Sequence, residues 1–90
     1  MKLHDITSAR LVRDAGIEAM DALNAIIVEA APHVSAAEEM DLRLAVGRAM
    51  SAILENLVNP VLRDHPELDV DEDTWGDIAN ARARDRLDRA

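Results

Sequence analysis

Acidic side chains alternate along the segment from Asp69 to Asp73, and this is the residue pattern with which a calcium-binding loop begins. Such a loop also needs a glycine at its sixth position, where the backbone turns sharply, and a bidentate glutamate at its twelfth. Counted from Asp69, these two positions are occupied by Thr74 and Asn80. Because neither position holds the required residue, we interpret the segment as the solvated acidic start of a helix, where negative charge is favourable.

The three histidines are candidate metal ligands, but they lie far apart in the chain, at His4, His33 and His65. Each falls near the expected end of a helix or in a loop. Glu29 and His33 have the spacing of two ligands on one helical turn, but Pro32 interrupts the helix between them. Metal sites in helical bundles use glutamate and histidine that project from intact helices. We therefore expect neither a metal site nor a cofactor.

Few side chains could act as nucleophiles or bases. The chain has no cysteine, Ser35 is accounted for as a helix cap, and Ser8 lies near the N-terminus without a partnered base. Asp14, Glu18 and Asp21 share one helix face, but paired carboxylates become useful in catalysis when burial makes their acidities differ. We expect this face to be solvated. The three glycines are isolated, which excludes a glycine-rich phosphate loop, and the sequence predicts no catalytic residue and no enzyme.

The segment from Arg82 to Arg89 is basic and could contact phosphate. Aromatic side chains, on which bases stack, do not accompany these arginines. Asp85 and Arg89 have the spacing of an ion pair on one helix, which favours internal pairing instead. The formal net charge of −8 also disfavours nucleic acid and anionic membrane surfaces. We expect neither nucleic acid nor membrane as a partner.

The chain is 90 residues long, which suits one domain, predicted to span residues 1–90. Phe and Tyr are absent and Trp75 is the single aromatic residue, so aliphatic side chains must fill the core. The abundance of Ala, Leu, Arg and Glu favours helices over strands, and the predicted fold class is all-α. No apolar run reaches the roughly 20 residues of a membrane span, and the N-terminus lacks the apolar stretch of a secretory signal. We therefore expect a cytoplasmic protein.

The first helix is predicted over residues 7–31. Asp5, Thr7 and Ser8 are all suitable N-caps, and the sequence does not choose among them. Pro32 ends the helix, because the residue before a proline is steered out of the α region. Apolar and small residues spaced three and four apart form a stripe that is typical of a bundle helix. The members of this stripe are Ala9, Val12, Gly16, Ala19, Leu23, Ile26 and Ala30.

Two further helices are predicted, over residues 36–58 and 72–88. Ser35 and Glu38 have the spacing of a capping box at the start of the second helix. Pro60 predicts a kink or a short separate turn over residues 60–64. The third helix carries acids at its start and arginines toward its end, which is the arrangement that the helix dipole favours.

The short loop after the first helix predicts that the first two helices form an antiparallel hairpin. If the loop is centred near His33, the numbers of facing residues sum to about 66. This register sets Gly16 against Met50, and Gly47 against Met20, so that a missing side chain meets a long flexible one.

The apolar arc of the second helix is wider than one neighbouring helix can cover, and the third helix carries little apolar surface. We therefore expect a homodimer in which two hairpins form a four-helix-type bundle. Glu39 and Arg43 have the spacing of an intrahelical ion pair at the margin of that interface. The expected protein interface comprises Ile17, Val28, Met40, Arg43, Leu44, Ile53, Leu57 and Trp75.

These features favour a non-enzymatic, homodimeric helical module that binds another protein of unknown identity. The alternative is an acidic inhibitor or antagonist, immunity-like or phage-encoded, whose carboxylates occupy a basic site on a target protein. The alternative depends on the net charge and on the acids between Glu67 and Asp77, because complementary charge speeds association. Strong weakening of partner binding by salt would favour the antagonist, and insensitivity to salt would favour apolar docking.

Overall fold

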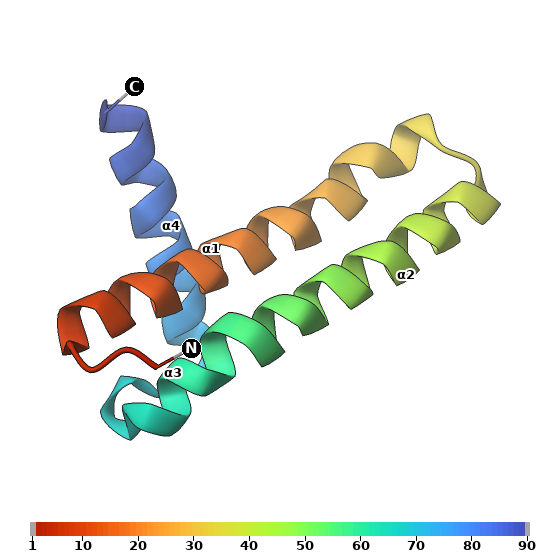
Figure 1. Ribbon diagram of the computed structural model, residues 1–90. Helices are drawn as coiled ribbons and strands as arrows, with labels where there is room; N and C mark the ends of the chain where they lie inside the picture. Colours follow the sequence, from red (N-terminus) through yellow and green to blue (C-terminus); the bar gives the residue numbers. More distant parts are fainter. Residues whose placement is uncertain (1, 90) are drawn as a thin grey trace.

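The computed structural model describes residues 2–89, without the side chain of Glu72, and all regular structure in that range is helical. The elements in chain order are α1 (Ile6–Ala30), the 3-10 turn η1 (Ala31–His33), α2 (Ala36–Ile53), the π-helical turn η2 (Leu54–Val58), α3 (Asn59–Asp64), the 3-10 turn η3 (Pro66–Leu68) and α4 (Glu72–Arg89). The all-helical prediction is confirmed, and the ends of the predicted domain, Met1 and Ala90, lie outside the described residues. Figure 1 shows α1 and α2 as an antiparallel pair, with α4 crossing α1 at a steep angle.

Local side-chain chemistry sets the starts of α1 and α2. The Asp5 carboxylate accepts hydrogen bonds from the backbone N–H of Ser8 at 3.2 Å and of Thr7 at 3.4 Å. These bonds make Asp5 the cap of α1 and hold its pKa below the ordinary value. At α2 the predicted capping box is present: the Glu38 N–H donates to Ser35 Oγ at 3.1 Å, and the Ser35 N–H donates to Glu38 Oε1 at 2.8 Å.

A short helical element, α3, lies where the short turn over residues 60–64 was predicted, but helical structure is continuous from α2 through η2 into it. A proline inside a helix normally clashes with the carbonyl four residues earlier. Here the turn before it is widened, since the Asn59 N–H donates to the Leu54 carbonyl, five residues back. A π-turn of this kind inserts one residue into an otherwise regular helix. Residues 36–64 therefore form one continuous α2–α3 rod.

The register of the hairpin differs from the predicted one. Gly16 packs against Ile53 and Val58 rather than Met50, since a β-carbon built on Gly16 would lie 3.5 Å from Ile53 Cγ2 and 2.7 Å from Val58 Cγ2. Nothing lies within 4 Å of the same position on Gly47, so its predicted contact with α1 is also wrong. The reason is that η1 continues the helical path beyond α1, which moves the centre of the loop further along the chain.

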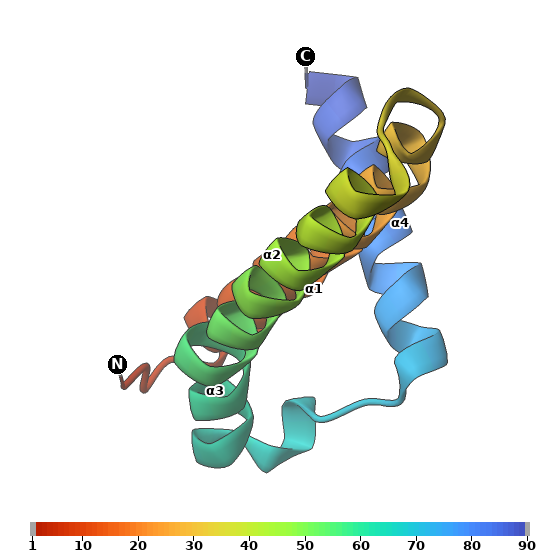
Figure 2. The same ribbon diagram turned by 90° about the vertical axis from the view of Figure 1, so that its right-hand side faces the viewer.

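The core lies at the end of the hairpin where α4 crosses it. Its buried apolar side chains form two clusters: Ile17, Met20, Val58 and Ala79; and Ala9, Val61 and Leu68. Trp75 and Ile78, the large apolar residues in the first turns of α4, pack against the first cluster. Figure 2 shows α4 standing to one side of the hairpin, joined to α3 through η3 and an extended segment. Although its apolar content is small, α4 thus covers the middle of α1.

The other end of the hairpin, toward η1, projects beyond this core (Figure 1). The buried apolar residues of this part are Ile27 of α1 and Val46 of α2. The Cα radius of gyration is 14.7 Å, whereas a compact chain of this length would have about 12 Å. In the described part of the chain, no helix is long and apolar enough to cross a membrane. The projecting end leaves much of α1 and α2 without a covering element.

Candidate interaction surface

His65 holds the N-terminal segment against the end of α3. Its Nε2 lies 2.6 Å from the Leu3 carbonyl oxygen and therefore donates to it, and its Nδ1 lies 3.5 Å from the Glu67 carboxylate. The Leu3 carbonyl, and to a smaller extent Glu67, raise the pKa of His65 above its ordinary value, because the protonated ring can donate to both oxygens. Among the described side chains, which exclude that of Glu72, no group of three His, Asp or Glu is placed to hold a metal ion.

Two charged side chains of α1 are buried, and neither was expected to be buried from the sequence. The first is Arg13, whose Nη1 donates to the Leu68 carbonyl at 2.7 Å. Its Nε donates to the Asp14 carboxylate at 2.8 Å, so the guanidinium is paired as well as hydrogen-bonded. Arg13 thereby ties η3 to α1 across 55 residues of chain.

The second is Glu18, which is only 8% exposed. Its Oε1 accepts from Arg82 Nε at 3.1 Å and from Arg86 Nη2 at 3.0 Å. The two arginines lie one helical turn apart on α4, so both reach the same carboxylate. The prediction that Glu18 belongs to a solvated acidic face is therefore wrong, and the side chain instead fixes α4 on α1.

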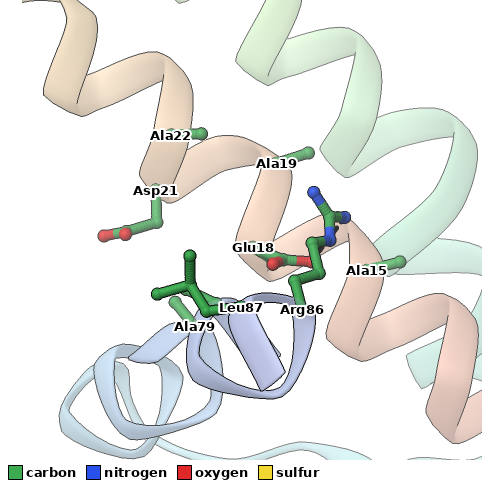
Figure 3. A pocket seen from close by; sticks show the side chains of 9 residues that line it. Ala15, Glu18, Ala19, Asp21, Ala22, Ala79, Arg86 and Leu87 are labelled. Atoms are coloured by element: carbon green, nitrogen blue, oxygen red, sulfur yellow. Dashed lines mark hydrogen bonds and ion pairs between the residues drawn. The ribbon is translucent and has the colours of Figure 1, made fainter. Parts of the chain in front are cut away.

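A groove of about 710 Å³ follows this ion pair between α1 and α4. Figure 3 shows Glu18 and Arg86 meeting from the two helices, with Leu87 on the α4 side. Most of the other lining residues are alanines: Ala15, Ala19, Ala22, Ala79 and Ala83. The groove thus has small apolar walls, and its charged lining residues are Asp21 and the paired Glu18 and Arg86.

Trp75 lines a second cavity, of about 410 Å³, between α1, α2 and α4. Met20 and Met50 also line this cavity, which gives it flexible apolar walls. The indole Nε1 is buried and, leaving the Glu72 side chain aside, has no hydrogen-bond partner in the described part of the chain. Trp75 is therefore mainly a packing residue that anchors α4.

The outer face of α2, on the side away from α1, holds the third hollow, of about 510 Å³. We define this outer face by the residues Met40, Arg43, Leu44, Gly47, Arg48, Ser51, Ala52 and Glu55. The hollow is lined by the small residues Gly47, Ser51 and Ala52 and by charged side chains, and Leu44 in the same lining is 55% exposed. Met40 follows one turn before Leu44 and is 65% exposed. Arg43 pairs with Glu39 at 3.1 Å, as its spacing predicts.

The predicted interface residues divide between this face, other exposed positions and the core. Three of the eight lie on the outer face of α2. Val28 and Leu57 are exposed elsewhere on the hairpin. Ile17 is 3% exposed, so its prediction as an interface residue is corrected: α4 crosses α1 at this point and buries it. Ile53 and Trp75 are half-buried and pack against the same core cluster, so they too belong mainly to the core.

Comparison of the chain with protein-family models, with curated proteins and with solved structures finds no match. The fold and the surfaces described above are therefore the basis for a functional proposal.

Proposed function

We propose that this protein is a non-enzymatic helical module that works through protein–protein contact and pairs with a second copy of itself. The outer face of α2 is the observation that carries the proposal. Met40 and Leu44 are more than half exposed, although they lie on a helix whose other side already packs on α1. Large apolar side chains exposed on a second side of a packed helix are typical of a bundle helix with a neighbour on each side.

The energies involved favour a weak, concentration-dependent dimer. Complete burial of a leucine or methionine side chain contributes about 1.5–3 kcal/mol. Covering the exposed parts of Met40 and Leu44 in both copies would then contribute roughly 4–7 kcal/mol. Association itself costs on the order of 4–15 kcal/mol. The free energy gained by burying these apolar side chains is therefore comparable to the free-energy cost of association. Further contacts between the copies must decide the affinity.

Sedimentation velocity over the micromolar range tests the proposal. The wild-type mass should rise with concentration from 9.9 kDa toward twice that value. Leu44→Ser should weaken the dimer roughly thirty- to hundredfold, because the lost burial counts once in each copy. Leu87→Ser is the matched control, since Leu87 is 76% exposed but lies on α4. A monomer at every concentration, or equal effects of the two substitutions, would contradict the proposal.

The acidic segment on which the antagonist alternative depends is partly engaged in local structure. The Asp71 carboxylate accepts from the Thr74 hydroxyl at 2.6 Å and from its N–H at 2.9 Å, which lowers the pKa of Asp71. Glu67 lies beside His65. Carboxylates that hold a helix start or a neighbouring ring are less free to occupy a site on a target. We therefore favour apolar pairing over antagonism.

A further inference from the structure

Four exposed charged side chains alternate in sign along the α2–α3 rod: Asp41, Arg48, Glu55 and Arg63. The first two intervals are seven residues and the last is eight. Seven residues complete about two turns of an α-helix, and η2 inserts one residue into the last interval. The four side chains therefore follow one side of the rod, and we name this set the charge ladder.

The π-turn is what completes the ladder. In a regular α-helix each added residue rotates the side-chain direction by about 100°. An interval of eight would then carry Arg63 away from the line of the other three charges. Because η2 absorbs the extra residue, Arg63 returns to that line. Within residues 2–89, setting the Glu72 side chain aside, none of the four forms an ion pair with another side chain.

We infer that a second copy of this chain docks antiparallel on the α2–α3 rod and that the charge ladder sets its direction and register; the inference rests on the proposed self-association. In an antiparallel pair the second copy presents its four charges in reverse order, so each charge meets one of opposite sign. Asp41 then faces Arg63 of the second copy, and Arg48 faces Glu55. Two-fold symmetry repeats both pairs, which gives four ion pairs in all. A parallel arrangement would set like charges against each other and is disfavoured.

The same register suits the packing of the outer face. The two-fold axis lies midway between the paired positions, which places it beside Ser51 and Ala52. Both residues line the hollow. Small residues at this point allow the two rods to approach closely. Met40 and Leu44 then extend over α3 of the second copy, so the exposed apolar side chains lie beside the charges. Flanking charges that set the direction of pairing in this way are known from coiled coils.

Charge reversal tests the ladder. Arg48→Glu and Glu55→Arg each replace two attractive pairs by two repulsive ones, so each should weaken the dimer roughly five- to thirtyfold in low salt. The double variant restores opposite charges and should recover wild-type affinity. An equimolar mixture of the two single variants should form heterodimers more tightly than either variant forms homodimers. Arg84→Glu and Asp77→Arg, exposed on α4, make the same changes in net charge and should leave the affinity unchanged.

The outcomes separate the ladder from the proposed function. If the single variants dimerise as tightly as the wild type, or the double variant fails to recover, the ladder is wrong, although a wild-type dimer that Leu44→Ser weakens would still support the proposed function in another register. If the wild type stays monomeric, the charge ladder and the proposed function are both wrong. All four side chains are exposed, and circular dichroism verifies that each variant remains folded.

Discussion

Gly16 offers a direct test of the packing at the base of the hairpin. A methyl group added there would lie 2.7 Å from Val58 Cγ2, well inside ordinary van der Waals contact, and 3.5 Å from Ile53 Cγ2. Val58 is fully buried, and a β-branched side chain in a helix has one strongly preferred rotamer. The clash therefore cannot be relieved by a small side-chain rotation, and α1 and η2 must separate.

The change in stability caused by Gly16→Ala follows from two opposing contributions. Alanine is favoured over glycine in a helix interior by about 1 kcal/mol. Overpacking a close-packed core costs about 1–3 kcal/mol. Gly76 provides the matched control, because it also lies within a helix and nothing is within 4 Å of its added methyl group. Gly76→Ala should therefore stabilise the fold, and Gly16→Ala should be less stable than Gly76→Ala by roughly 2 kcal/mol.

Urea denaturation followed by circular dichroism measures this difference, with both variants at the same low protein concentration. A difference of this size corresponds to roughly 10 °C in Tm for a chain of this length. Val58→Ala removes the methyl group that clashes, so it should cost less in the Gly16→Ala background than in the wild type. Equal stability of the two glycine variants would refute the close approach of Gly16 to η2 and the register that depends on it.

Three further predictions follow from single contacts. Replacing Arg82 and Arg86 together by Met leaves the buried Glu18 carboxylate unpaired and should lower the free energy of unfolding by about 2 kcal/mol. Glu18→Met should lower it by less, because the two arginines that lose their partner are partly exposed. Urea denaturation measures both values. The pKa of His65 is raised in the folded state, so the stability that its protonation adds is present below its unfolded pKa and is lost as the pH rises through the raised value. His65→Gln should therefore reduce the fall in Tm between about pH 6 and pH 8, and an unchanged pH profile would contradict the Leu3 contact. Ser35→Ala removes the cap of α2 and should lower stability by about 1 kcal/mol, and an unchanged urea midpoint would argue against the capping box.

Features set by neighbouring residues could be predicted from the sequence. The capping box depends on two side chains three residues apart, which is chemistry that acts within one turn of chain. The end of the first helix was predicted to within one residue, but the expected reason is wrong: Ala31, the residue before Pro32, keeps α-helical angles of φ −49° and ψ −43°, and the chain continues into η1. The fold class also followed from composition, because a chain with a single aromatic residue and much alanine strongly favours helices.

Features that depend on distant contacts could not be predicted. Glu18 was assigned to a solvated face because its partners lie 64 and 68 residues away. Ile17 was assigned to an interface because the path of α4 across α1 is a tertiary property. The charge ladder could not be recognised from the sequence for a related reason. Its last interval of eight residues would turn Arg63 away from the other charges in a regular helix, and the π-turn that corrects this is known only from the structure.

Distances between spin labels on two copies test the antiparallel pairing most directly. The chain has no cysteine, so one introduced cysteine gives one label per copy, and Asn56, Ala45 and Ala37 are exposed positions on the rod. With the two-fold axis beside Ser51 and Ala52, the separations along the rod should be about 13, 20 and 44 Å in that order, because each residue away from the axis adds about 3 Å. Equal distances at the three positions, or no dipolar coupling between copies at any of them, would contradict the account.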